Sequence, residues 1–177
     1  MTDFTTIEAY GVLTAPATLR MERLLPGPIE RIWDYLTRSE MRRLWLASGE
    51  MELKAGAPFE LVWRNDELTD PPTRRASGEP HEHSQQCRII AADPPRMLAF
   101  QFGPNGDVTF TLEPKGADVL LTMLHERIPN RDTLLGVSAG WHQHLDTLVA
   151  RANGQPVPDY WEGKDRLSKE YAARFPG

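Results

Sequence analysis

The stretch LLGVSAGWHQHLDTLVARANG, residues 134–154, decides the fold that we expect for this chain. Its apolar and small residues recur every three or four positions, which is the spacing of one helical face. The residues of this stripe are Leu134, Ser138, Trp141, Leu145, Leu148 and Ala152. Asn153 and Gly154 follow as a typical helix C-terminus. The pattern therefore predicts one long helix that buries a single stripe, with Trp141 at its centre.

His142 and His144 flank this stripe. Residues two positions apart on a helix point about 200° around the axis from each other. Because a helix chelates a metal through residues three or four apart, we expect these histidines to serve packing, not a shared metal. Gly140 is expected to let the helix approach the sheet closely. Gln143 is expected opposite Trp141, where replacement by alanine would cost under about 0.5 kcal/mol.

The composition excludes several classes of protein. The chain has 177 residues, 25% of them charged, and a formal net charge of −5, which argues against a nucleic-acid or anionic-membrane surface. Cys87 is the single cysteine, so neither an internal disulfide nor a cysteine-rich zinc site is expected. The N-terminal segment lacks the features of a signal peptide, and no apolar run approaches the ~18 residues of a membrane span. We therefore expect a cytoplasmic protein.

Apolar–polar alternation predicts that most of the preceding chain is β-sheet. One strand is expected at 17–25, and two short helices follow within 26–37 and 40–47. The further strands are expected at 50–56, 58–65, 85–93, 96–103, 106–116 and 119–128. This order predicts an α+β fold, in which a curved antiparallel sheet of about six to seven strands wraps around the long C-terminal helix.

Three segments lie outside this order. Residues 1–15 are weakly patterned and are expected to form an N-terminal arm before the main domain, 16–154. Residues 65–82 are rich in proline and charge, which is typical of a long exposed loop. Residues 155–177 form a C-terminal extension in which we expect a short amphipathic helix.

A cavity can remain between the long helix and the sheet, and its candidate lining residues are Trp45, Trp63, Phe100, Phe110, His125 and Trp141. Aromatic side chains in a core most often serve packing alone, and a ligand-binding role is the alternative. The strand phase sets His125 with Val119, Leu121 and Met123. Its ring faces either the cavity, as a polar anchor, or the solvent, and the sequence leaves both open.

The remaining candidates for metal binding or catalysis are supported only weakly by the sequence. If the segment HEH, 81–83, is extended, His81 and His83 project from one face and could share a metal. No third ligand is evident, so we predict no metal site and no cofactor. Cys87 is expected to be a small buried side chain in a strand. The sequence contains no nucleophile elbow, phosphate-binding glycine loop or pair of carboxylates at a readable catalytic spacing.

Four motifs, in this order, resemble the helix-grip superfamily of START lipid-transfer domains, birch-pollen-allergen-like proteins and polyketide cyclases. They are PGPIERIWDYLTRSEMRRLW (26–45), IIAADPPRMLAFQF (89–102), DVTFTLEPKGADVLLTMLHERI (107–128) and GWHQHLDTL (140–148). Within the superfamily, the chain resembles homologues of the C-terminal domain of the heat-shock protein 90 ATPase activator, over about residues 18–154. The 65–82 loop is longer and more polar than the resemblance implies, and the tail after 154 lies outside it.

The resemblance implies a helix-grip fold more firmly than an activity, because one fold hosts many functions. We expect a non-enzymatic protein that binds an apolar small molecule or a protein partner. A cyclase or dehydratase is the second hypothesis, with His125 as its acid or base. His125→Ala would then abolish turnover while leaving the melting temperature nearly unchanged. A chaperone ATPase co-factor is the third, and the resemblance alone suggests it.

Overall fold

The computed structural model describes residues 7–69, 71–73 and 81–177. Parts of two expected segments therefore lie outside the described residues: 1–6 of the arm, and 70 and 74–80 of the polar loop. The elements are β1 (Val12–Ala15), β2 (Thr18–Pro26), α1 (Ile29–Thr37), α2 (Ser39–Arg42), β3 (Pro58–Trp63), η1 (Asn65–Leu68), β4 (His83–Asp93), β5 (Met97–Gln101), η2 (Gly103–Asn105), β6 (Asp107–Lys115), β7 (Asp118–Glu126), α3 (Arg131–Ala152) and α4 (Tyr160–Arg174).

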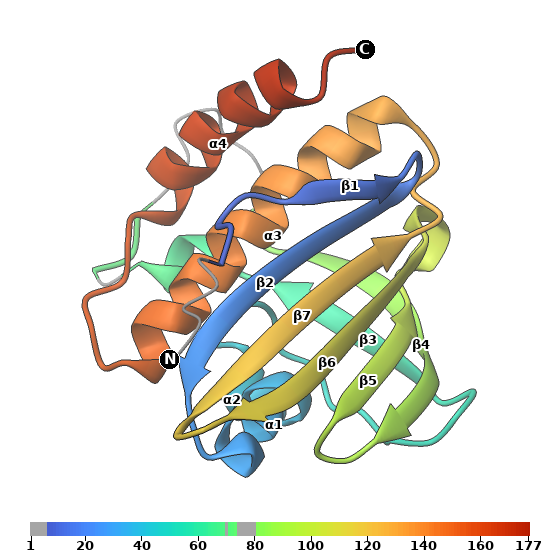
Figure 1. The fold of residues 1–177 in the computed structure, drawn as a ribbon, viewed down its shortest axis with the longest axis vertical. Coiled ribbons are helices and arrows are strands. Elements are labelled where there is room, and N and C mark those ends of the chain that lie inside the picture. The colour runs from blue at the N-terminus through green and yellow to red at the C-terminus, as the bar shows by residue number, and fades with distance from the viewer. Residues whose placement is uncertain (1–6, 70, 74–80) are drawn as a thin grey trace, which may run out of the picture.

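The strands form one antiparallel sheet in the order β1-β2-β7-β6-β5-β4-β3, which curves around α3 (Figure 1). The predicted α+β helix-grip fold is confirmed. Alternation places one side of each central strand against α3, as in β7, where Leu121, Met123 and His125 are fully buried. Phe110 of β6 lies opposite Met123 in the register and is buried on the same face. The core therefore lies between the sheet and α3.

The long helix ends at the residues that its sequence indicates, and it begins at Arg131 after a capping residue, Asn130. The side chain of Asn130 accepts a hydrogen bond of 2.8 Å from the Thr133 backbone N–H, which caps the first turn. At the other end, Gly154 has a φ of +64°, which glycine adopts without strain. The predicted stripe from Leu134 to Ala152 is buried.

One strand differs from the prediction. Residues 50–56 form no strand: β3 lies at the edge of the sheet, where it pairs with β4, and residues 50–56 follow a loop that the buried guanidinium of Arg42 organises. This group donates hydrogen bonds to the backbone carbonyls of Leu36, Ala47 and Gly49. The first strand of the sheet is instead β1, in the segment that the sequence assigns to an arm. All four residues of β1 are exposed, so its sequence lacks the apolar–polar alternation that would predict a strand.

The C-terminal extension forms α4, a helix of 15 residues that packs along α3 (Figure 1). Its Gly163 lies where an added Cβ would overlap the side chain of Gln143, so glycine permits this close approach. Gln143 is consequently only 1% exposed. The expectation of a solvent-facing Gln143 is therefore wrong, because α4 covers the side of α3 that the sheet leaves free.

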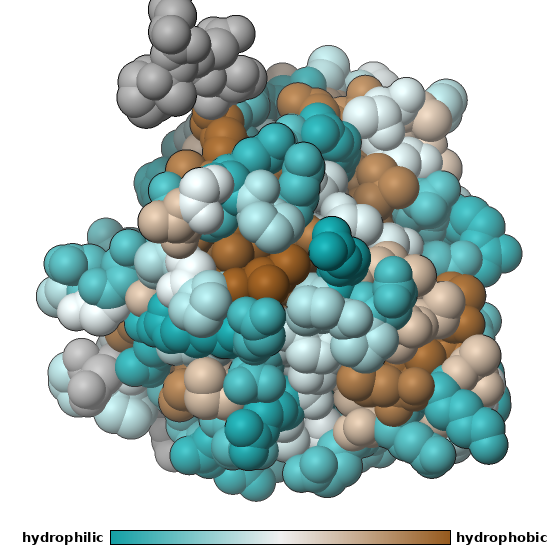
Figure 2. Space-filling model, turned by 60° about the horizontal axis from the view of Figure 1, so that its bottom comes forward, coloured by the Kyte–Doolittle hydropathy of each residue, from teal (hydrophilic) through white to brown (hydrophobic). Residues whose placement is uncertain are grey.

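The outer surface is mostly polar. Figure 2 shows separate brown apolar areas within a largely hydrophilic face. Among the described residues, the exposed large apolar side chains are Val12, Leu13, Leu24 and Ile90. Within the part of the chain that the structure describes, no helix has the length and apolar character needed to cross a membrane.

Candidate ligand pocket

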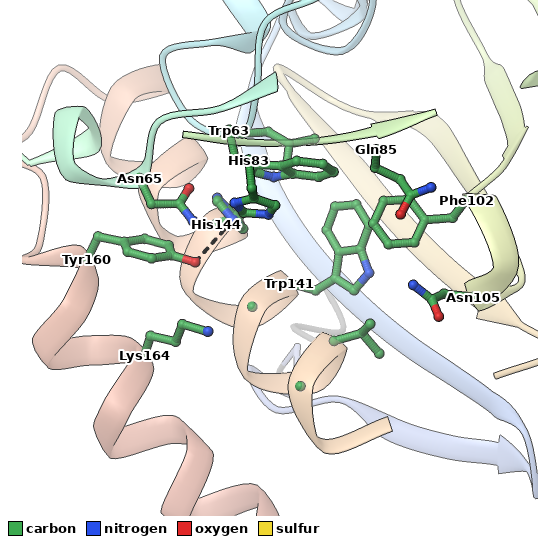
Figure 3. Close-up of a pocket in the computed structure, with 14 residues that line it drawn as sticks. Trp63, Asn65, His83, Gln85, Phe102, Asn105, Trp141, His144, Tyr160 and Lys164 are labelled. Atoms are coloured by element: carbon green, nitrogen blue, oxygen red, sulfur yellow. Dashed lines mark hydrogen bonds between the residues drawn. The ribbon is translucent and has the colours of Figure 1, made fainter. Parts of the chain in front are cut away.

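A pocket of about 310 Å³ opens between the first half of α3, the adjoining ends of β3 and β4, η2 and α4 (Figure 3). It is lined by Leu46, Trp63, Asn65, His83, Gln85, Phe102, Asn105, Gly136, Val137, Gly140, Trp141, His144, Tyr160 and Lys164. Its wall thus combines aromatic rings, side-chain amides and two helical glycines.

Aromatic rings form one side of the pocket. Trp63 and His83 are direct partners in the β3–β4 register, and their rings stack with centroids 4.9 Å apart and planes within 6°. Phe102 lies edge-on to Trp63 at 5.9 Å, and it also contacts Trp141 at 6.0 Å. These rings come from the sheet and from α3 and surround one space, which suits a flat apolar molecule.

Gly136 and Gly140 form the helical side of the pocket, one turn apart on α3. A Cβ atom added at either position would meet nothing within 4 Å. The expectation that Gly140 permits a close approach to the sheet is therefore wrong. Because Gly140 has no side chain, the space beside Trp141 stays open and forms part of the pocket.

His125 lies behind this wall and not in it. Its Nδ1 accepts a hydrogen bond of 3.0 Å from the Trp141 indole N–H, which leaves Nε2 to donate one of 2.7 Å to the Asn105 carbonyl. Burial lowers the pKa of His125, which favours the neutral ring. The ring therefore faces the interior, where it joins α3 to η2, and both of its nitrogens are occupied.

The candidate lining residues divide into two groups. Trp63 and Trp141 line the pocket, whereas Trp45, Phe100, Phe110 and His125 pack in the core. Phe110 lies edge-on to Trp45 at 6.3 Å and to Trp141 at 5.7 Å. It therefore packs behind Trp141 and does not line the pocket.

His142 and His144 point to different partners, as expected. His144 donates from Nδ1 to the Trp45 carbonyl at 2.9 Å, and the Tyr160 hydroxyl lies 3.3 Å from its Nε2. The His142 Nδ1 lies 2.8 Å from the hydroxyl of Tyr171, and its Nε2 lies 3.3 Å from Asp146. The sequence places these rings correctly about the helix, but it gives no sign that α4 supplies both tyrosines.

The two histidine rings of the HEH segment point to different partners and do not face a common metal position. The Nδ1 of His81 lies 3.0 Å from Asp66 and its Nε2 lies 3.6 Å from Glu67, while His83 stacks on Trp63. Among residues 7–69, 71–73 and 81–177, no three His, Cys, Asp or Glu side chains are grouped to hold a metal ion.

The fold and this site can be compared with known proteins. The family described as Activator of Hsp90 ATPase homolog 1-like protein matches residues 26–153. The chain belongs to this family. Among curated proteins, none matches it. The activator-like resemblance seen in the sequence is thus confirmed.

Solved structures share the activator-like fold. A protein from Bordetella parapertussis, determined by NMR in solution, is 32% identical and has a TM-score of 0.81, covering 99% of this chain and 96% of its own. CalU16 from Micromonospora echinospora is 21% identical, with a TM-score of 0.65 and 93% of each chain covered. The Aha1 dimer from Colwellia psychrerythraea is 13% identical, with a TM-score of 0.55 over 76% of this chain and 95% of that chain.

The pocket extends beyond the activator-like region. Most of its wall lies within residues 26–153, but Tyr160 and Lys164 come from α4, which follows that region. Sequence periodicity could not place them in the pocket, because the position of α4 depends on its packing against α3.

The burial of His144 predicts an acid sensitivity of this activator-like domain. Burial is the main cause that lowers the pKa of His144 to about 4, from an ordinary value of 6.5. The unfolded chain therefore takes up this proton first, so the contribution to stability is complete above about pH 6.5 and is lost as the pH falls toward 4. We expect His144 to remove about 3 kcal/mol from the free energy of unfolding between pH 7 and pH 4.

Urea unfolding at several pH values tests this expectation. The comparison is with His144→Asn, whose side-chain amide can still donate to the Trp45 carbonyl but does not titrate. Between pH 7 and pH 4, the free energy of unfolding of the variant should fall by about 3 kcal/mol less than that of the wild-type chain. Equal declines in the two proteins would show that His144 is not the group responsible.

Proposed function

We propose that this chain binds a small aromatic or otherwise apolar molecule in the pocket beside Trp141. The single observation that carries the proposal is a space of about 310 Å³ bounded by aromatic rings and by two helical glycines whose Cβ positions are empty. Small-molecule sites commonly have volumes of about 300–1,000 Å³ and are mainly apolar with a few polar groups. The activator-like fold also commonly binds hydrophobic ligands. Cys87 is a buried free thiol, which is compatible with a reducing compartment. We therefore propose a cytoplasmic location.

The enzymatic alternative has less support. A general acid or base must exchange a proton with its substrate, but both nitrogens of His125 are engaged by Trp141 and Asn105. His144 likewise has both nitrogens engaged, by Trp45 and Tyr160. A role as a chaperone co-factor is suggested by the family alone, and no feature of this pocket favours it. We therefore retain ligand binding as the function.

Mass spectrometry under native conditions, on protein purified from its own host, tests whether the pocket carries a ligand. We expect a bound small molecule, seen as a mass above that of the chain and released on denaturation. A bare chain in that spectrum, together with no binding of 2-naphthoate, 2-naphthamide or 2-naphthylmethylammonium, would contradict the proposal. These three probes share one flat apolar ring system and differ in charge.

Filling the pocket should abolish binding of all three probes. Gly140→Leu places a branched side chain in the open space, and no clash at Cβ prevents folding. The matched control is Gly140→Ala, which should raise helix stability by about 1 kcal/mol and leave most of the space open. Calorimetric titration measures the affinities, and thermal unfolding confirms that both variants fold. If Gly140→Leu binds the probes as well as the wild-type chain does, their site lies elsewhere.

A further inference from the structure

The pocket differs in charge from the rest of the chain. The chain has 25 acidic and 20 Lys and Arg residues and carries a net charge of −5. Among the described residues that line the pocket, by contrast, none is Asp or Glu, while Lys164 is positively charged. Because the acids predominate overall, this composition of the wall favours molecules that carry negative charge.

Lys164 is the fixed cation of this wall. Tyr160 and Lys164 lie four residues apart, hence on one face of α4, and Figure 3 shows Tyr160 directed from α4 toward His144 and Lys164 directed toward α3. The Lys164 charge is one of the causes that keep the pKa of His144 low, after burial as the main one. The electrostatic effect of Lys164 therefore reaches the inner wall of the pocket.

Asp66 is a buried carboxylate that is turned to partners outside the pocket. Asp66 follows Asn65 in the chain, but its Oδ1 accepts a hydrogen bond of 2.8 Å from the Trp161 indole N–H. Its Oδ2 lies 3.0 Å from the Nδ1 of His81. Asp66 does not line the pocket, and it therefore holds η1 against α4 and does not supply an acidic group to the pocket wall.

We infer that the ligand of this pocket is a planar aromatic acid, whose ring lies among Trp63, Phe102 and Trp141 and whose carboxylate meets the ammonium group of Lys164. This inference rests on the proposed function, since it names the class of molecule that the pocket binds. It also gives α4 a role in ligand choice, because the helix contributes the cation from outside the activator-like region.

The three naphthalene probes separate this inference from the proposed function. In the wild-type chain, 2-naphthoate should bind about tenfold more tightly than 2-naphthamide, because a hydrogen bond between two charged groups is stronger than one to a neutral carbonyl. 2-Naphthylmethylammonium should bind most weakly. Added salt should weaken the binding of 2-naphthoate and leave that of 2-naphthamide unchanged.

Lys164→Met keeps the apolar stem of the side chain and removes the charge. We expect it to lower the affinity for 2-naphthoate about tenfold and to lower that for 2-naphthamide much less, so that the preference for the acid disappears. The matched control is Lys169→Met, at an exposed position of the same helix outside the pocket, which should keep the preference.

Two results would overturn the inference while leaving the proposed function intact. One is equal or tighter binding of 2-naphthamide or of the ammonium probe by the wild-type chain. The other is a preference for 2-naphthoate that survives Lys164→Met. Failure of all three probes to bind, together with a bare chain in the native mass spectrum, would instead remove the proposed function, and the inference with it.

Discussion

Trp141→Ala is expected to lower the free energy of unfolding by about 3–5 kcal/mol, which is the usual cost of truncating a buried tryptophan. Trp141 is 4% exposed, lies edge-on to Phe110 and contacts Phe102. Its indole N–H also donates to His125, so truncation opens a cavity and leaves a buried acceptor without its donor. Against a total stability of about 5–15 kcal/mol, a loss of this size removes a large share of the free energy of folding.

Urea unfolding measures this loss. Trp141→Phe keeps an aromatic ring in the same space and removes the N–H donor, so its loss should be clearly smaller than that of Trp141→Ala. If Trp141→Ala costs less than about 1 kcal/mol, which is typical of a surface substitution, then α3 does not bury the face that we assign to it.

His125→Ala is expected to lower the free energy of unfolding by at least about 3 kcal/mol, because it creates a cavity and removes the partners of two buried groups. The Trp141 N–H and the Asn105 carbonyl both lose the hydrogen bonds that His125 provides. This is the opposite of what a catalytic role predicts, namely loss of turnover at an unchanged melting temperature.

The measurement is again urea unfolding, with His81→Ala as the control. His81 is about half exposed, so its truncation opens no buried cavity, and the control should cost clearly less than His125→Ala. A His125→Ala chain with nearly wild-type stability would show that the ring is not a structural link, and it would restore the enzymatic hypothesis.

The architecture could be predicted because burial on one face leaves a period in the sequence. The alternation of β6 and β7 identified the inward side of both strands, and the stripe through Trp141 identified the sheet-facing side of α3. The strand β1 could not be recognised in this way, because its four residues are all exposed and its pairing with β2 is its main interaction.

The pocket could be predicted only in part. Trp63 and Trp141 were recognisable as aromatic residues on inward faces, but the same reasoning also selected Trp45, which the core buries completely. Lys164 belongs to a segment whose position depends on packing against α3. Gly140 illustrates a different limit, because the sequence alone does not distinguish a close helix contact from an open space.

The most direct test of the account is the response of individual tryptophans to 2-naphthoate in NMR spectra of the ¹⁵N-labelled chain. The five tryptophans give five indole N–H signals, of which Trp63 and Trp141 belong to the pocket and Trp33 lies away from it on α1. We expect the signals of Trp63 and Trp141 to shift progressively during the titration while that of Trp33 stays in place, and we expect Gly140→Leu to abolish these shifts. Unmoved Trp63 and Trp141 signals with both 2-naphthoate and 2-naphthamide, or shifts that persist in Gly140→Leu, would contradict a ligand site beside Trp141.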